Sequence, residues 1–306
     1  MKARSFLVVF LFLSRLAFSQ DEESTDKPLT DKKVKGFHLG VYTGTLFANK
    51  YTASLYDGYG WNWDGKKNDF EHSFIYNKVW IEYGAHGAFA GQTDRIALAL
   101  GVQHTDWSFD EGDMPLPNSL KYNVAFVVGL NTRYCFNKKS SIIANFNATK
   151  LSVNGNFQIT LQPVSAQTGL PGAINYRTFS ILGGELREIL QVGYQSVEGD
   201  DEKLNFFWEI GPLITLSKFE RNEILINSLR IPLTSFYNPY GVLQYNARNL
   251  TGIGYGAFVG GGFNITLGTK WTVQLLYTAS YENIKLLQDS KLKLQHNVGV
   301  RAYYNF

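Results

Sequence analysis

The 306-residue chain has a single cysteine, Cys135, so it cannot form an intrachain disulfide. After residue 19 it has no run of about eighteen apolar residues, which excludes a transmembrane helix. Its histidine, cysteine and carboxylate residues do not follow the spacing of a metal site. The run Gly254-Tyr255-Gly256 lacks the strand-turn-helix setting of a dinucleotide site. We therefore expect no metal ion, no cofactor and no helical membrane span.

The first nineteen residues have the three parts of a secretory signal peptide. Lys2 and Arg4 form a basic start, residues 6–13 are apolar, and Ala17-Phe18-Ser19 is a small-x-small cleavage site. We expect export and cleavage after Ser19. Residues 20–35 are polar and charged, so we expect a disordered periplasmic tail there.

The formal net charge of +3 comes from the expected signal peptide. Its removal takes away Lys2, Arg4 and Arg15, and leaves 26 of the 29 basic residues against 26 acidic residues. A mature chain without net charge gives no reason to expect a nucleic-acid partner.

Residues 292–306 alternate between apolar and polar side chains with a period of two, which predicts a β-strand with one apolar face. The same pattern recurs along the chain. It predicts ten strands, over residues 37–47, 79–89, a segment that begins at Arg95, and residues 120–136, 142–151, 181–196, 204–216, 252–267, 271–284 and 292–306. The sixth segment also places Glu188 on its apolar face, unless a bulge corrects the phase.

The connections between these segments alternate in length. Short turns are expected at residues 91–94, 137–139, 198–203 and 268–270, and long loops at about 48–78, 106–119, 155–180 and 219–251. Short turns on one side and long loops on the other are typical of an all-β, transmembrane, antiparallel up-and-down β-barrel, here over residues 36–306. Ten strands are predicted, or twelve if the third or fourth long loop hides a hairpin.

A soluble β-sandwich would also alternate, but it would not gather outward aromatic residues near the short turns. Such residues suit the headgroup boundary of a membrane. The expected set is Phe37, Phe89, Tyr134, Phe136, Tyr194, Phe206, Trp271, Tyr304 and Phe306.

The opposite strand faces carry charges that are expected to form a polar network in the lumen. The residues are Glu82, Glu185, Glu209 and Glu282, with Arg133, Arg187, Lys293 and Arg301. Equal numbers of each sign favour a structural plug over a selective pore, because buried charges persist when they are paired. If the last hairpin turns at residues 286–291, Glu282 lies opposite Lys293 and Gln274 opposite Arg301.

The first long loop is the candidate contact surface. It carries Tyr51, Tyr56, Tyr59, Trp61 and Trp63 among glycines and aspartates, and such residues make adaptable contacts with sugars or proteins. The alternative is that this loop packs on itself or across the barrel mouth.

Catalytic patterns are weak. An omptin-like protease would need paired acids and an Asp-His couple at the outer rim, and the nearest substitute is His104-Thr105-Asp106. No serine, histidine and acid converge on one face as an acyl-hydrolase requires. We therefore expect that the protein is not an enzyme.

The chain resembles the bacterial outer-membrane β-barrel superfamily. The resemblance rests on Ala17-Phe18-Ser19, the alternating segments and the terminal Tyr304-Asn305-Phe306. Within that superfamily it is most similar to the small barrels common in Bacteroidota envelopes, of which PorT-type secretion barrels are one branch. The resemblance implies an outer-membrane location, contact with membrane lipid and lipopolysaccharide, and an insertion signal at Tyr304 and Phe306 that the barrel-assembly insertase reads.

The function expected from these features is a structural or interaction role, in which long extracellular loops bind an envelope partner or a ligand. The first alternative is a narrow channel for small solutes. The second is an omptin-like surface hydrolase.

Overall fold

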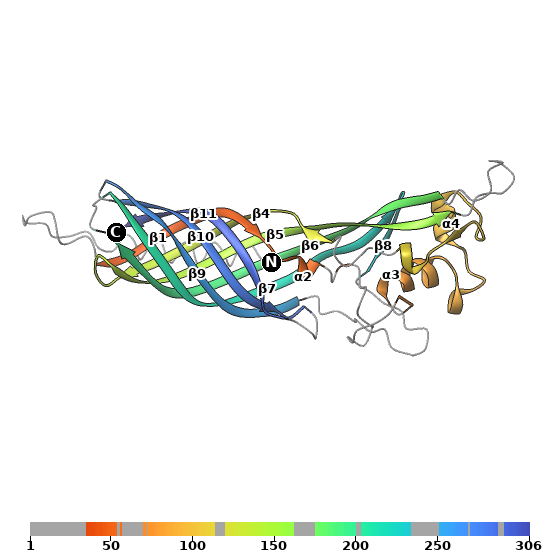
Figure 1. Cartoon of the computed structure of the whole chain (residues 1–306), viewed down its shortest axis with the longest axis horizontal. Coiled ribbons are helices and arrows are strands. Elements are labelled where there is room, and N and C mark those ends of the chain that lie inside the picture. The colour runs from red at the N-terminus through yellow and green to blue at the C-terminus, as the bar shows by residue number, and fades with distance from the viewer. Residues whose placement is uncertain are drawn as a thin grey trace, which may run out of the picture.

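A computed structural model describes residues 35–53, 56, 70–71, 73–113, 120–161, 175–199, 203–233, 251–268, 270–286 and 291–306. The expected signal peptide and almost all of the expected tail lie outside these residues. Eight antiparallel strands form a closed barrel (Figure 1). They are β1 (Gly36–Phe47), β4 (Ala125–Cys135), β5 (Ser140–Leu161), β6 (Asn175–Glu198), β7 (Leu204–Ile226), β9 (Thr251–Leu267), β10 (Trp271–Ile284) and β11 (Lys293–Asn305).

The strands are staggered around the barrel. Following paired residues from Phe47 on β1 through β11, β10, β9, β7, β6, β5 and β4 leads back to β1 at Phe37, ten residues earlier. Such a stagger requires the strands to tilt against the barrel axis. Residues 136–139, the ends of β6 and β7 at Glu198 and Leu204, and the ends of β9 and β10 at Leu267 and Trp271 lie at the same end as Gly36 and Asn305, which we call the terminal end.

The predicted antiparallel β-barrel is confirmed, but the predicted count of ten strands is wrong. Residues 79–83 belong to a π-helix, η1 (Asn77–Tyr83), and residues 87–89 form a 3-10 helix, η2 (Gly87–Phe89), while the segment that begins at Arg95 forms α4 (Arg95–Leu100). The twelve-strand alternative is wrong as well. The fourth long loop does contain an extra strand, β8 (Leu229–Pro232), but it pairs with β7 outside the ring.

Local signals explain why residues 95–100 are helical. The side chain of Asp94 accepts a hydrogen bond from the amide of Ala97 at 2.8 Å and caps the first turn. Gly101 ends the helix with φ 73°, and its amide donates to the carbonyls of Ala97 and Leu98. Ile96 is buried while Leu98 is 70% exposed, so the apolar face follows a helical and not a strand period.

Strands β5, β6 and β7 are longer than the sequence predicted and project beyond the barrel (Figure 1). Together with β8 they form a sheet whose inner face is covered by short helices from the β1–β4 connection. These are α2 (Lys50–Ala53), α3 (Phe74–Tyr76), η1, η2, α4 and η3 (Glu111–Asp113), and the same connection holds β2 (Trp107–Ser108) and β3 (Lys121–Tyr122), which pair with β5. We call this projecting part the head.

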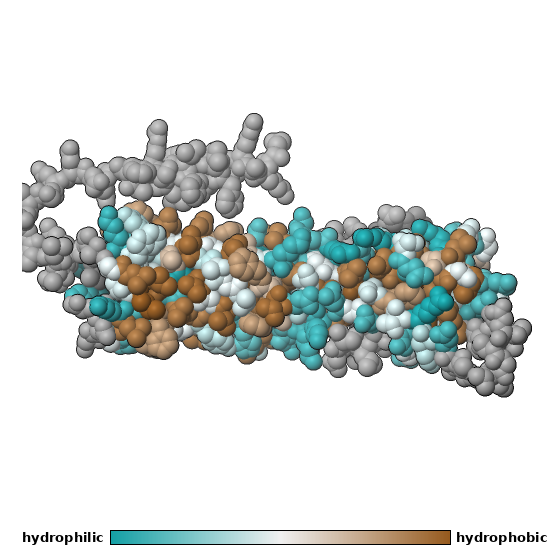
Figure 2. Space-filling view, turned by 90° about the horizontal axis from the view of Figure 1, so that it is seen from above, coloured by the Kyte–Doolittle hydropathy of each residue, from teal (hydrophilic) through white to brown (hydrophobic). Residues whose placement is uncertain are grey.

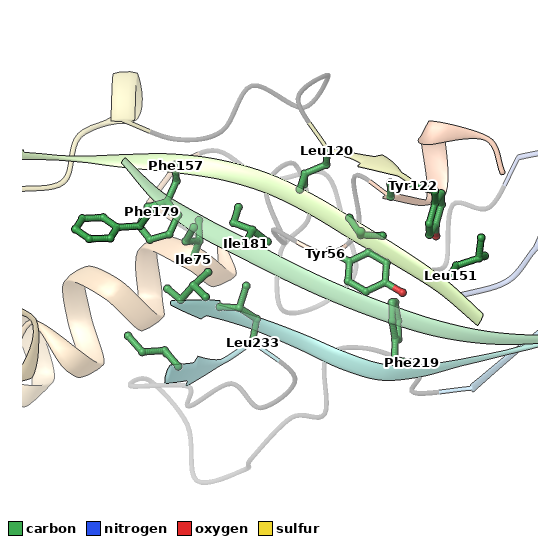
Figure 3. Close-up of a cluster of buried hydrophobic side chains, with 14 of the residues drawn as sticks. Tyr56, Ile75, Leu120, Tyr122, Leu151, Phe157, Phe179, Ile181, Phe219 and Leu233 are labelled. Atoms are coloured by element: carbon green, nitrogen blue, oxygen red, sulfur yellow. The ribbon is translucent and has the colours of Figure 1, made fainter. Parts of the chain in front are cut away.

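A hydrophobic core fills the head (Figure 3) and continues into the barrel as far as Phe207 and Leu276. Its buried residues include Ile75, Val79, Ile96, Trp107, Phe109, Leu120, Val153, Phe157, Phe179, Ile181, Ile224, Ile231 and Leu233. Burying this much apolar surface stabilises a compact unit, so residues 155–161 and 175–180 are strands where a loop was expected.

The polarity of the two strand faces inverts between barrel and head. On β5, the inward face is mostly polar in the barrel, where Ile143 is the exception, and apolar in the head, in the order Ile143, Asn145, Asn147, Thr149, Leu151, Val153, Phe157, Ile159. The outward face changes in the opposite sense, in the order Ile142, Phe146, Lys150, Ser152, Asn154, Asn156. The barrel is therefore apolar outside and polar inside, and the head is the reverse, as a water-soluble unit requires.

The apolar exterior of the barrel forms a continuous band (Figure 2). Its exposed side chains include Val41, Phe126, Val128, Leu190, Ile210, Ile214, Val259, Phe263, Leu275, Val298 and Val300. Outward aromatic rings pack on one another near the terminal end, in the pairs Tyr134–Phe136, Tyr194–Trp208, Phe206–Phe263, Trp271–Tyr304 and Tyr304–Phe306. The expectation for Phe89 is wrong, because it lies in η2 of the head.

Candidate functional site: the lumen and mouth of the barrel

The described part of the lumen holds two polar networks and a small apolar cluster of Ile143, Leu213 and Phe258. The first network lies nearer the terminal end and is centred on Arg301 of β11. Its Nη1 and Nη2 donate to the two carboxylate oxygens of Glu209 at 2.9 and 3.2 Å. Gln274 Oε1 accepts from Arg301 at 3.2 Å, and Gln195 Nε2 donates to Glu209 at 3.1 Å. Arg133 reaches Gln195 at 3.4 Å. These side chains come from β4, β6, β7, β10 and β11, so the network crosses the barrel interior.

The second network lies nearer the head and is centred on Glu185 and Arg187 of β6. Arg187 Nε donates to Glu185 Oε1 at 2.6 Å, and both side chains are 0% exposed. Arg187 Nη1 donates to Gln295 Oε1 at 2.7 Å, and Gln295 Nε2 donates to Glu282 Oε1 at 2.5 Å. Glu282 also accepts from Thr215 Oγ1 at 2.5 Å. We call this the mouth network.

Residues from the β1–β4 connection complete the mouth network. The hydroxyls of Tyr122 and Tyr56 donate to Glu185 Oε2 at 2.6 and 3.1 Å, and Thr52 Oγ1 accepts from Arg187 at 3.2 Å. Ser217 also donates to Glu185. Hydrogen bonds to a charged group are stronger than those between neutral groups. The contacts that close the mouth of the barrel therefore also hold the β1–β4 connection to the barrel wall.

Six of the eight residues predicted for the lumen network lie inside the barrel: Arg133, Glu185, Arg187, Glu209, Glu282 and Arg301. They carry three charges of each sign. The prediction for Glu82 is wrong, because it lies on η1 in the head, where its carboxylate pairs with Lys78 at 2.6 Å. Lys293 does lie opposite Glu282, as Gln274 lies opposite Arg301, so both predicted pairings are present. However, Lys293 Nζ lies over the ring of Tyr51 at 4.8 Å, outside the network.

Gln274 was expected opposite Arg301, but sequence reasoning missed the other two amides of the networks. Gln195 and Gln295 stand at inward positions of predicted strands, and counting amides as well as charges would have found them. The alternation over residues 120–136 puts Tyr122 on the same outward face as Tyr134 and Phe136, and a bulge explains why Tyr122 lies inward instead. Tyr122 pairs with Val153, and Val127 pairs with Thr149, so four residues lie between the first pair and the second on one strand and three on the other. The extra residue turns Tyr122 inward.

The predicted contact surface is placed only in part, because Tyr59, Trp61 and Trp63 lie outside the described residues. The expectation of a solvent-facing contact residue is wrong for Tyr56, which is 0% exposed and packs edge-on against Phe219 in the core beside its hydrogen bond to Glu185. The alternative interpretation, a loop that packs across the barrel mouth, describes Tyr56. Tyr51 is half-buried under Lys293.

An Asp–His pair lies in the head and was missed because its members are distant in sequence. His104 Nδ1 lies 2.7 Å from Asp94 Oδ2, which also accepts from the indole of Trp107 at 2.9 Å. The ring of His86 stacks between those of Trp80 and His104, and burial lowers the pKa of His86. Asp94 is also the N-cap of α4, so these contacts stabilise the first turn of that helix.

No helix among the described residues is long and apolar enough to cross a membrane. In the same residues, no group of three or more histidine, cysteine, aspartate or glutamate side chains is placed to hold a metal ion.

The interior and exterior together define a closed, eight-stranded β-barrel of inverted polarity with a projecting head. No protein-family model and no curated protein matches the chain. Among solved structures, one similar chain is Ail, the attachment invasion locus protein of Yersinia pestis, in complex with the heparin analogue sucrose octasulfate. It is 11% identical, with a TM-score of 0.35 over 89% of this chain and 99% of that one. Another is the outer membrane protein OprG from Pseudomonas aeruginosa, 10% identical, with a TM-score of 0.36 over 91% and 99% of the two chains. Likenesses of this size assign no function to the chain.

Proposed function

We propose that the protein is an integral outer-membrane β-barrel whose lumen is closed by its own side chains, and whose head binds an envelope partner or a ligand outside the cell. The observation that carries this proposal is the mouth network, which joins Tyr56, Tyr122 and Thr52 to Glu185 and Arg187 within the barrel. Closure of this kind supports a structural or interaction role, because a solute has no open path past buried, paired charges.

The apolar exterior supports the membrane location. Outward apolar side chains and a terminal-end belt of aromatic rings are the surface that a lipid bilayer requires, while water would disfavour so large a continuous apolar band. In this proposal the signal peptide of residues 1–19 is removed after Ser19, the tail of residues 20–35 lies in the periplasm, and the insertase reads Tyr304 and Phe306. The Bacteroidota-type, PorT-like resemblance remains part of the proposal.

Orientation is tested by thiol labelling of intact cells. Asn156→Cys places a thiol on the exposed outward face of the head, and Lys270→Cys places one in an exposed turn at the terminal end. We expect a membrane-impermeant maleimide to label the first variant in intact cells and the second only after lysis. Native Cys135 is buried and should stay unlabelled until the protein is denatured. Labelling of Lys270→Cys alone in intact cells would reverse the orientation.

The alternative, a channel for small solutes, is tested by conductance. Purified protein in a planar bilayer is expected to give no stable unitary current steps, because both networks obstruct the lumen. Folding must be verified in the same sample by a migration shift between heated and unheated protein on a denaturing gel. Reproducible unitary steps from folded protein would reject the closed barrel and favour the channel.

A further inference from the structure

An open groove lies on the outward face of β5, β6 and β7, at the height where the strand faces invert. Its volume is about 690 Å³, and it is lined by Lys150, Ser152, Gly183, Gly184, Lys218, Phe219, Glu220, Arg221 and Glu223. None of these residues belongs to the two lumen networks, although Gly184 precedes Glu185 in the sequence. We infer that this groove binds the phosphate headgroup of an outer-leaflet membrane lipid, an inference that rests on the proposed membrane location.

The backbone explains why the wall is hollow here. The register between β6 and β7 shifts between Gly184 and Glu185, where Gly184 pairs with Arg221 and Glu185 with Phe219. Glu220 is the extra residue of this bulge, so Glu220 and Arg221 are both exposed. Gly184 contributes no side chain to the floor, and a Cβ there would lie 3.3 Å from the Cβ of Arg221. The bulge thus splays two charged side chains around a floor of backbone.

The groove lies close to the apolar band. Lys150 and Lys218 both pair with Leu186 and so flank it on the two neighbouring strands. Two residues along the strands toward the terminal end, the row is Ala148, Glu188 and Leu216, and two residues further it is Phe146, Leu190 and Ile214, all exposed and apolar. A ligand in the groove therefore meets cations at one end and hydrocarbon-compatible surface at the other, which is the arrangement of a lipid headgroup above its acyl chains.

Charge selects an anion. Lys150 Nζ pairs with Glu220 at 2.5 Å, and Glu223 pairs with Arg221 at 2.5 Å and with Arg230 at 3.3 Å. Lys218 is exposed and makes none of the ion pairs found in the described part of the chain. With the neighbouring Glu188, four cations and three carboxylates line or border the groove. Nε and Nη2 of Arg221 already donate to Glu223. Lys218 and Nη1 of Arg221 therefore provide the donors for a phosphate.

The test uses the full mature chain refolded in neutral detergent, with diphosphoryl lipid A as the probe and bound lipid counted by native mass spectrometry. The double variant Lys218→Gln/Arg221→Gln is expected to bind about tenfold more weakly than wild type, the scale of one lost charge-assisted contact. The matched control is Lys285→Gln. Lys285 follows β10 at the same end of the barrel but lies over the ring of Tyr255 at 5.1 Å, away from the groove. This control should keep wild-type affinity.

Three results would overturn the inference: equal affinity of wild type and double variant, equal binding of dephosphorylated lipid A, or displacement of lipid A by millimolar inorganic phosphate, which would assign the groove to a free anion. The proposed membrane location fails separately, if folded wild-type protein does not insert into lipid vesicles at all. Because Lys218 and Arg221 are exposed, an unchanged heat-dependent gel shift should verify that the double variant folds.

Discussion

Arg187→Met is expected to destabilise the folded barrel by about 3–5 kcal/mol, because Glu185 would retain a buried charge without its counter-ion. Both side chains are 0% exposed, and Nε of Arg187 lies 2.6 Å from Glu185. The hydroxyls of Tyr122 and Tyr56 would still donate to the carboxylate, but they carry no positive charge. The measurement is the urea midpoint of unfolding in lipid vesicles, followed by tryptophan fluorescence.

Two further variants make that result specific. Arg187→Met combined with Glu185→Gln removes both charges and should recover much of the lost stability, because a neutral pair of similar size leaves no buried charge. Lys150→Met breaks an ion pair of 2.5 Å on the outer surface, where Lys150 is 69% exposed, and should cost at most about 1 kcal/mol. If Arg187→Met costs no more than Lys150→Met, the mouth network is not a buried, water-excluded site.

Val298→Arg is expected to prevent most of the chain from assembling in a bilayer. Val298 lies near the centre of β11, is 47% exposed, and points outward within the apolar band. An arginine facing lipid near the middle of the membrane costs about 2–4 kcal/mol. The measurement is the fraction of protein that shows the heat-dependent gel shift after refolding into vesicles. Phe263→Arg on β9 should have a smaller effect, because Phe263 is 53% exposed on the same surface but packs with Phe206 nearer the terminal end, where a lipid-facing charge costs less.

The control is the adjacent residue. Asn297 faces inward and accepts a hydrogen bond from Tyr42. Asn297→Asp therefore adds one unit charge to the polar lumen, on a side chain of nearly unchanged size that keeps the acceptor oxygen. Assembly of this variant should stay close to wild type. Equal loss of assembly in Val298→Arg and Asn297→Asp would mean that the assignment of lipid-facing and lumen-facing sides is wrong.

The sequence predicted the barrel well where one physical pattern acts alone. Over 271–284 and 292–306, apolar and polar residues alternate with few exceptions, such as Leu276 and His296, and the register of Glu282 with Lys293 followed from that parity. The sequence misled where two patterns compete. Residues 95–100 alternate as a strand would, yet Asp94 and Gly101 are helix-capping residues, and these caps together with burial of Ile96 decide the outcome.

The head was not predicted because alternation was interpreted with a fixed outward face. Beyond Thr149, β5 continues to alternate, but its apolar residues move to the inward face, so the strand was expected to end near Leu151. The mouth network depended on information that the sequence does not carry. A bulge turns Tyr122 inward, and only the folded chain brings Thr52 and Tyr56 to the β6 residues Glu185 and Arg187.

The unbroken course of β6 from the barrel into the head sets a mechanical property. Residues 175–184 continue the strand beyond the mouth, a distance of about 30 Å at about 3.3 Å per residue. The pairing of β6 with β5 runs through the mouth without a register shift, although β7 bulges there. In the proposed membrane location, the tip and anything bound to it are therefore held at a set distance from the lipid surface. A pull on the tip acts along β5, β6 and β7 and loads their inter-strand hydrogen bonds in shear, many at once, instead of peeling them one by one.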